Sequence, residues 1–381
     1  MKGQIRNIYP GGNTPKGFYS YYNYILPGRK AKKKFCIKGG PGTGKSTFMK
    51  DIGRYFLNKG EDVDLMWCSS DPDSLDGIIL KERRTAVVDG TAPHVTDPQD
   101  PGAADVILNF GDFWDAKGLE AGKDEIRRAN EKISGYFSRA YGFLGCVKCQ
   151  YDFLGELIME SIRDESLLEM KNMIFTRLEG ISPLRRRERG IRRDIIMGKG
   201  AERGEVKRCF AGAITPKGIK SGLDSLTEGM ENIIAIEAPA GFRGEELLSR
   251  VSEKGRDAGI YTEEYYCPVD PEKKLEHVIF PEIKTAVITE NRYHRAGAEK
   301  KQGKVFRIDA VSMVKGDEDS LLLREELERE SERYIKRAVD FLKKAKAEHD
   351  RLEEYYVDSM DFKRLEELKN KVIATIEEDV L

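Results

Sequence analysis

The strongest constraint on the fold of this 381-residue chain is an internal duplication. The sequence Thr-Pro-Lys-Gly at 14–17 recurs at 215–218, and Arg-Ala-x-x-Phe-Leu at 139–144 recurs at 337–342. Further short matches follow in the same order, and the offset stays between 198 and 201 residues. Matches in one order at one offset indicate two homologous halves, so we expect the same arrangement of elements to occur twice.

In each half, short apolar segments alternate with segments of helical periodicity. Strands that alternate with helices are typical of a parallel sheet covered by helices on both faces. We therefore predict an α/β fold class with one such sheet in each half. The expected strands lie at residues 34–38, 63–68 and 85–89 in the first half and at 260–267 and 285–289 in the second.

Each half closes with long, highly charged segments. In the second half, residues 320–348 and 350–378 are rich in Leu, Glu, Lys and Arg and predict an antiparallel helical hairpin. The apolar heptads are too irregular for a coiled coil. The residues expected to be buried include Tyr334, Val339 and Leu342.

An arginine-rich run at 184–193 lies between the halves. A basic run of this kind is either a nucleic-acid-binding patch or a solvated linker, and the lack of interleaved aromatic residues favours the linker. We predict a first domain at 1–182, a basic linker at 183–204, and a second domain with the helical hairpin at 205–381.

Composition limits the partners of the chain. The net charge of −1 gives no overall attraction to nucleic acid or to anionic lipid. No apolar run is long enough to span a membrane, and the first residues lack a secretory apolar region. Six scattered cysteines do not resemble a disulfide framework, so we expect a cytoplasmic location. The Cys-x-x-Cys at 146–149 lacks the partner pair of a structural zinc site.

The sequence Gly-Gly-Pro-Gly-Thr-Gly-Lys-Ser at 39–46 is a complete phosphate-binding loop. It follows the predicted strand at 34–38 and opens a helix-period run at 47–56, which is the context that this motif requires. Glycines allow backbone N–H groups to close around phosphate oxygens, and the helix N-terminus adds partial positive charge. Lys45 would reach the outer phosphates, and the Ser46 hydroxyl would bind Mg²⁺. The residues expected to bind the nucleotide are Gly39, Gly40, Pro41, Gly42, Thr43, Gly44, Lys45, Ser46 and Thr47.

Two acidic residues follow predicted strands of the first half. Asp89 ends the apolar strand 85–89 and is expected to hold Mg²⁺ directly or through water. Asp71 follows the strand 63–68, at the sheet edge where ligands bind in α/β folds, and could orient an attacking water or accept a proton. Its counterpart Asp270 persists in the second half, so turn formation before a proline is an equal explanation.

Other polar residues have weaker claims. His94 has a counterpart in His294, which favours a structural histidine over a catalytic one. The lysines of the two Thr-Pro-Lys-Gly turns, Lys16 and Lys217, share this ambiguity. The acidic residues Asp112 and Asp115 are expected to form a solvated turn.

The second half has lost the loop chemistry. Aligned on its proline, the second loop spans 237–244 and begins with Glu237, which puts negative charge where phosphate would lie. A phenylalanine there obstructs close backbone approach, and a glycine removes the hydroxyl for Mg²⁺. The counterpart of Asp89 is Thr289, so loop and carboxylate are lost together. In place of Gly44, Lys45 and Ser46 stand Phe242, Arg243 and Gly244.

The 39–46 loop with Asp89 resembles those of the P-loop NTPase superfamily. The whole chain resembles a bacterial family of duplicated P-loop ATPase-like proteins, through Thr-Pro-Lys-Gly, the loop, Ser-Ser-Asp-Pro-Asp at 69–73 and Val-Val-Asp-Gly-Thr-Ala-Pro-His at 87–94. The resemblance covers nearly the entire chain and implies tandem P-loop NTPase-like domains that use ATP or GTP with Mg²⁺. It brings no established substrate, and the altered loop at 237–244 departs from an intact tandem pattern.

Three functions fit these features. The first is Mg²⁺-dependent hydrolysis of a nucleoside triphosphate, expected to be ATP, at one site in the first half. The catalytic candidates are then Lys45, Asp89 and Asp71, and the second half has a structural or regulatory role in contact with the first. A further hypothesis is that the second half docks on the first and that Arg243 contacts the phosphates bound there. The alternatives are a small-molecule or nucleotide kinase with the hairpin as lid, and a non-catalytic ATP-gated binding or scaffold protein.

Overall fold

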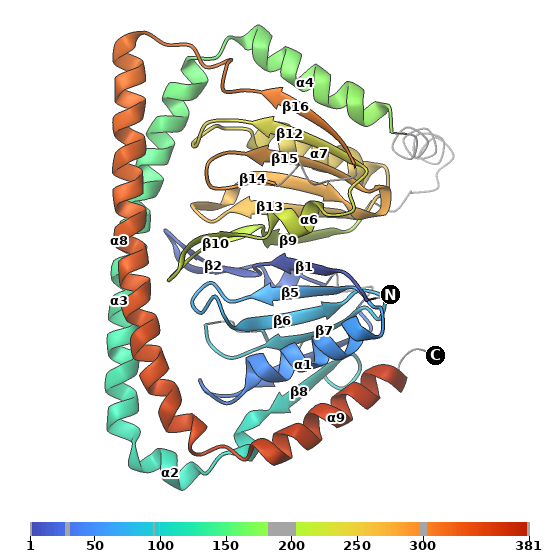
Figure 1. Ribbon diagram of the computed structural model, residues 1–381, viewed down its shortest axis with the longest axis vertical. Coiled ribbons are helices and arrows are strands. Elements are labelled where there is room, and N and C mark those ends of the chain that lie inside the picture. The colour runs from blue at the N-terminus through green and yellow to red at the C-terminus, as the bar shows by residue number, and fades with distance from the viewer. Residues whose placement is uncertain are drawn as a thin grey trace. The chain divides into compact units, whose positions relative to one another are not determined.

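The computed structural model describes residues 2–26, 31–93, 96–98, 100–181, 203–296 and 303–378. It contains two six-stranded, mostly parallel sheets flanked by helices (Figure 1). The α/β fold class predicted from the sequence is therefore confirmed. All but the last two residues of the predicted basic linker, 183–204, lie outside the described residues.

The first sheet has the strand order β1-β5-β6-β7-β4-β8. Its strand β6 runs antiparallel to both neighbours, whereas the remaining ladders are parallel. The sequence prediction of a wholly parallel sheet missed this strand. Residues 68–74 and 81–84, which flank β6, are too few for the helical crossover that a parallel connection needs. The strands are β1 (Ile5–Ile8), β4 (Lys33–Lys38), β5 (Val63–Trp67), β6 (Leu75–Leu80), β7 (Thr85–Asp89) and β8 (Asp105–Asn109).

The second sheet repeats the first strand for strand. Its order, β9-β13-β14-β15-β12-β16, again places one antiparallel strand, β14, between its neighbours. The duplication read from the sequence is thus a duplication of topology. The strands are β9 (Val206–Phe210), β12 (Asn232–Glu237), β13 (Thr262–Cys267), β14 (Asp270–Phe280), β15 (Thr285–Glu290) and β16 (Lys304–Asp309).

Each Thr-Pro-Lys-Gly sequence is the turn of a small hairpin. In the hairpin of β2 (Gly11–Thr14) and β3 (Gly17–Ser20), the Thr14 hydroxyl donates to the Gly17 carbonyl and accepts the Lys16 N–H. Gly17 has φ 96°, which favours glycine. The hairpin of β10 (Gly212–Thr215) and β11 (Gly218–Ser221) has the same turn. These threonines therefore act in turn formation.

The helices begin and end as follows: η1 (Tyr22–Tyr24), α1 (Lys45–Asn58), η2 (Phe110–Phe113), α2 (Ala116–Ala121), α3 (Lys123–Glu160), α4 (Asp164–Glu179), α6 (Leu223–Thr227), α7 (Glu245–Asp257), η3 (Pro281–Ile283), α8 (Glu318–Val357) and α9 (Phe362–Glu378). The predicted break near residue 349 is wrong, because α8 continues to Val357. The chain turns instead at 358–361, where the Asp361 carboxylate accepts the Arg364 N–H at the start of α9.

The predicted hairpin also differs from the structure in its packing. Helix α9 packs against α1 and η2, and Figure 1 shows it diverging from α8 after the turn. Val339 and Leu342 are buried as predicted, and Tyr334 is half-buried with its ring 6.3 Å from that of Phe143. A helical period fixes which face of a helix is apolar but not which surface covers that face.

The chain forms two compact units, and each takes a helix from the opposite repeat. Unit 1 comprises residues 1–142, 213–220 and 336–381, so it combines the first sheet with α9. Leu365, Val372 and Ile376 of α9 lie in the same buried cluster as the apolar residues of β4, β7 and α1. Residues far apart in the sequence thus make one core, and the expected contact between the two halves is present.

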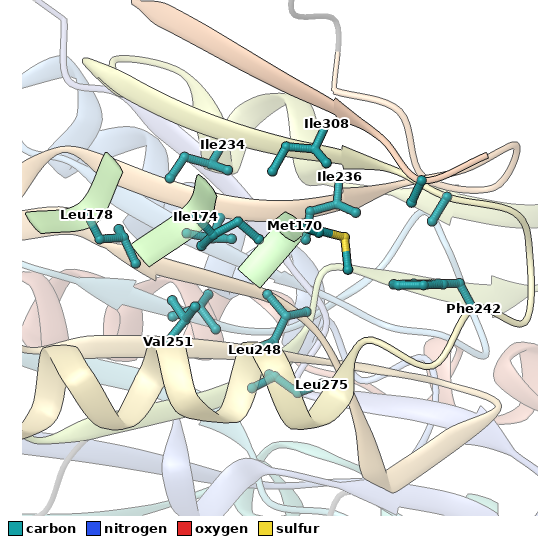
Figure 2. Close-up of a cluster of buried hydrophobic side chains, with 14 of the residues drawn as sticks. Met170, Ile174, Leu178, Ile234, Ile236, Phe242, Leu248, Val251, Leu275 and Ile308 are labelled. Atoms are coloured by element: carbon teal, nitrogen blue, oxygen red, sulfur yellow. The ribbon is translucent and has the colours of Figure 1, made fainter. Parts of the chain in front are cut away.

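Unit 2 comprises residues 143–212 and 221–335 and combines the second sheet with α4. Met170, Ile174 and Leu178 of α4 pack between the isoleucines of β12 and β16 on one side and the apolar residues of α7 on the other (Figure 2). The closing helix of each repeat therefore belongs to the unit built on the other repeat's sheet.

Replacing a buried side chain of a closing helix by alanine should destabilise the sheet of the opposite repeat. Leu178 and Ile376 occupy equivalent positions and are 0% and 1% exposed. Each alanine substitution should cost about 2–5 kcal/mol, because a buried aliphatic side chain is replaced by a cavity. In hydrogen exchange, I376A should expose amides of β4 and β7, and L178A those of β12 and β15. The reverse pattern would contradict the exchange of helices.

Candidate functional site

The glycine-rich loop, residues 39–44, connects β4 to α1 in unit 1. Strand β4 pairs in parallel with β7, with Ile37 opposite Asp89, so the loop and Asp89 emerge at the same edge of the sheet. Gly42 and Gly44 have φ values of 67° and 85°, in a region that residues with a side chain rarely adopt. The Gly44 carbonyl accepts the Phe48 N–H and opens α1.

Lys45 is the first residue of α1, and it brings two predicted residues together. Its Nζ lies 3.6 Å from the Asp89 Oδ2, and the two side chains are 12% and 11% exposed. The same Nζ donates to the Gly39 carbonyl at 2.9 Å and to the Gly40 carbonyl at 2.6 Å. The ammonium group is therefore held over the loop, beside a carboxylate.

Asp89 is fixed by Thr91, a residue that the sequence analysis did not identify. The Thr91 N–H donates to the Asp89 Oδ1 at 2.8 Å. The Thr91 hydroxyl donates to the Gly39 carbonyl at 2.9 Å and accepts the Gly39 N–H at 3.1 Å. This clamp joins the end of β7 to the start of the loop. Its only sequence signal is a hydroxyl residue two positions after Asp89.

The hydroxyl residues of the loop differ in their surroundings. The Ser46 Oγ accepts the Leu75 N–H at 3.0 Å, which leaves one lone pair and the hydroxyl hydrogen. Thr43 is buried and donates to the Gly40 carbonyl at 2.8 Å. Thr47 is exposed. Ser46 is therefore better placed than Thr47 to serve as a ligand beside Lys45.

Asp71 forms a turn and also contacts α8. Its Oδ1 accepts the Asp73 N–H at 3.3 Å and its Oδ2 accepts the Ser74 hydroxyl at 2.7 Å, so the turn-forming role holds. Its Oδ2 also lies 3.6 Å from the Nζ of Lys346. Asp73 pairs with Lys217, the lysine of the second Thr-Pro-Lys-Gly turn, at 2.5 Å. Residues of the second repeat thus line this edge of unit 1.

Helix α8 lies directly on the loop. A Cβ placed on Gly42 would lie 2.7 Å from the Glu353 carbonyl oxygen, and one on Gly40 would lie 2.5 Å from a ring carbon of Tyr356. The glycines therefore allow close approach of a helix as well as turns of the chain. Sequence analysis missed Glu353, although it stands in a repeat-matched stretch where the first half has glycine.

Glu353 and His349 lie one helical turn apart, with the His349 Nδ1 3.4 Å from the Glu353 Oε1. This nitrogen is buried and makes no hydrogen bond within the described residues, so the two side chains are in contact without being bonded. Burial lowers the pKa of His349 and raises the pKa of Glu353. The positive charges of Lys346 and Lys45 act on both groups, and Asp71 acts on them with the opposite sign. The loop lysine, Asp71 and this helical pair therefore form one electrostatic cluster.

The weaker candidates have structural roles where they are described. His94 lies outside the described residues. Asp115 accepts the Lys117 N–H at the start of α2, and Asp112 accepts the side-chain amide of Asn109. All six cysteines are free thiols. Asp112 and Asp115 therefore lie in a turn, as expected, and Asp115 also caps α2.

The second loop has a different chemistry. Phe242 is 3% exposed and packs in the core of unit 2 (Figure 2). Arg243 donates to the Asp152 carbonyl of α3 at 2.9 Å and lies 3.3 Å from the Glu156 carboxylate. Where Lys45 is held over its own loop, Arg243 is held by α3. Its contacts lie within unit 2.

The carboxylates near the second loop are paired. Glu237 lies 2.8 Å from Arg307, and Glu290 lies 2.6 Å from the same guanidinium. The Glu290 Oε1 also accepts the Ala296 N–H at 2.9 Å. Glu237 and Glu290 thus share one cation of the sheet itself.

A buried cluster of Glu276, His277 and His294 lies in unit 2. A bulge in β14 places Glu276 between the residues that pair with β13, and the His294 Nε2 lies 3.3 Å from the Glu276 Oε2. The His277 Nδ1 accepts the Thr289 N–H at 3.3 Å, so the proton of the neutral ring resides on Nε2. That tautomer is unsuited to metal ligation through Nε2, and we assign the cluster a structural role.

Comparisons with protein-family models, with curated proteins and with solved structures find no match. In the described part of the chain, no helix carries an apolar stretch long enough to cross a membrane.

Buried His277 should make stability fall with decreasing pH. Burial lowers its pKa from 6.5 to about 3, so below pH 6.5 the unfolded chain binds a proton that the folded protein does not. The loss should reach at most about 1.4 kcal/mol per pH unit. H277Q keeps an acceptor for Thr289 and should unfold with a shallower pH dependence between pH 7 and pH 4 in calorimetry. Parallel curves for the two proteins would refute this account.

Proposed function

We propose that the protein binds a nucleoside triphosphate, ATP in the first instance, with Mg²⁺ at the 39–46 loop of unit 1 and hydrolyses it. The observation that carries the proposal is the 3.6 Å separation of the Lys45 Nζ and the Asp89 Oδ2 at the start of α1. A glycine loop, a helix N-terminus, a lysine and a strand-end carboxylate together supply what phosphoryl transfer needs, which is positioning and charge neutralisation.

The donor atoms suit a hard divalent cation. Ser46 retains a lone pair after accepting the Leu75 N–H, and Asp89 offers a carboxylate oxygen on the side of Lys45. Hydroxyl and carboxylate oxygens are preferred Mg²⁺ ligands. Bound Mg²⁺ would neutralise charge on the outer phosphates. Lys45 would exchange its two carbonyl partners for phosphate oxygens, which are stronger acceptors for an ammonium group.

A single site is favoured because the second loop lacks the same parts. Phe242 fills the core where Gly44 opens a helix, and Gly244 has no hydroxyl. Arg243 is engaged by α3, which argues against its donation to the phosphates of the first loop. We assign the second half a structural or regulatory role, expressed through the helices that it contributes to unit 1.

Substitution of Lys45 should show which of the two loops binds the nucleotide. K45A should weaken binding of ATP·Mg²⁺ about hundredfold or more, since charge-assisted hydrogen bonds are each worth about 1.5–3 kcal/mol. R243A, at the equivalent position, should leave binding unchanged. Calorimetric titration measures both, with melting temperatures as a check of folding. Equal binding by K45A and wild type would refute the site.

Release of phosphate without an added acceptor distinguishes hydrolysis from the alternatives. Hydrolysis predicts Mg²⁺-dependent release of inorganic phosphate, abolished in D89N. A kinase would release little phosphate until an acceptor is supplied, and a scaffold would bind ATP without turnover. Either of those results would replace the proposed reaction while leaving the nucleotide site intact.

A further inference from the structure

The two helices that cover the loops differ where they face them. Residues 143–156 of α3 and 341–354 of α8 share the pattern Phe-Leu-x-x-x-Lys-x-x-x-Asp-x-Leu-x-Glu. Within this matched stretch, His349 stands in place of Tyr151 and Glu353 in place of Gly155. The helix over the intact loop therefore carries an imidazole and a carboxylate that the helix over the altered loop lacks.

The glycine of α3 is tied to the altered loop. A Cβ on Gly155 would lie 2.8 Å from the Arg243 Nε and 3.0 Å from the Gly241 carbonyl oxygen. A glutamate cannot fit there while Arg243 keeps its contacts with Asp152 and Glu156. Loop and covering helix have thus diverged together in unit 2.

The shared lysine and aspartate of the two helices make the same contacts in both units. Lys346 lies 3.6 Å from Asp71, and its counterpart Lys148 lies 3.4 Å from Asp270. Lys346 also pairs with Asp350, as Lys148 does with Asp152. These retained pairs dock each helix on its sheet edge. Docking of the helix explains the lysine and the aspartate of the shared pattern. It does not explain why His349 and Glu353 stand where α3 has other residues.

The placement of Glu353 fits a role at the loop. Its backbone lies against Gly42, and its side chain is 34% exposed, so it is neither buried in the core nor fully solvated. The carboxylate feels the charge of Lys45, and the His349 Nδ1 lies 3.4 Å from its Oε1. A carboxylate on the helix that covers the loop, within the field of Lys45 and in contact with a second titratable group, is placed to accept a proton from a water at the loop.

We propose that Glu353, positioned by His349, accepts the proton of the water that attacks the terminal phosphate. This inference rests on the proposed function. The water oxygen forms a bond to the terminal phosphorus, and the bond from that phosphorus to the bridging oxygen breaks. The nucleoside diphosphate leaves with that electron pair, and the proton of the water passes to the Glu353 carboxylate. The second repeat thereby supplies the reactive group of a site whose phosphate cradle belongs to the first.

The test compares E353Q with E354Q. Glu354 is the exposed neighbour of Glu353 on α8 and provides a matched loss of charge. E353Q should keep the wild-type Kd for ATP·Mg²⁺ and lose about 10²–10⁴-fold in kcat, the range for general-base catalysis. E354Q should keep both. Binding of ATP by E353Q also reports that the loop and α8 remain folded.

A double-mutant cycle tests the role of His349. H349Q should lower kcat with unchanged KM, and the pair H349Q/E353Q should lose no more than E353Q alone, because a positioning residue acts through its partner. Equal kcat for E353Q and wild type would overturn the inference while leaving the proposed function standing. Tighter ATP binding by E353Q without loss of kcat would also overturn the inference, because the only effect of the carboxylate would then be to repel the phosphates. A wild-type protein that binds ATP but does not hydrolyse it would overturn the proposed reaction and this inference together.

Discussion

Burial of a closing helix on the sheet of the other repeat is the interaction on which the rest of the structure depends. Helix α9 completes the core of unit 1, and α4 completes that of unit 2. Without these helices, the apolar faces of α1 and α7 and of the strands beneath them would be partly exposed, at a cost that scales with the apolar area returned to water. The core of each unit therefore includes residues of both repeats. The chain therefore specifies two units that each need both repeats.

The exchange also explains the length of α3 and α8. Each begins in one unit and ends in the other, because the chain must carry its last helix away from the sheet that precedes it. A helix satisfies its own backbone hydrogen bonds along its whole length, so a single helix can contribute residues to both units. The passage brings the residues of these helices to the glycine loops. The candidate site therefore contains residues of both repeats for the same reason that the repeats exchange their closing helices.

Much of unit 1 could be predicted from sequence because the signals are local. An apolar strand, a glycine loop and a helical period fix β4, the loop and α1, and the approach of Lys45 to Asp89 follows from two parallel strands that end at one edge. The partner of α9 could not be predicted. The two sheets share one topology and both have buried apolar faces, so the period of α9 does not distinguish between them. Glu353 escaped for the same reason, since its role is visible only once α8 is known to cover the loop of the other repeat. Strand β6 was missed because its neighbours in sequence were taken to be joined by crossovers.

Charge at the loop gives a reason for a divalent cation in the proposed reaction. Asp71, Asp89 and Glu353 bring carboxylates to this edge of unit 1, while Lys45 and Lys346 bring two ammonium groups. One of these, Lys346, is shared with Asp350, and Lys45 is already beside Asp89. A triphosphate adds several negative charges that these lysines cannot offset. Without a divalent cation the carboxylates would repel the ligand, and with one they become its ligands or its neighbours. The second loop differs, because its two carboxylates, Glu237 and Glu290, share the Arg307 guanidinium and no described hydroxyl replaces Ser46 at Gly244. The two loops of one chain therefore differ in the partners of their carboxylates and in the Ser46 hydroxyl, and that difference favours a cation-bound ligand at the first loop alone.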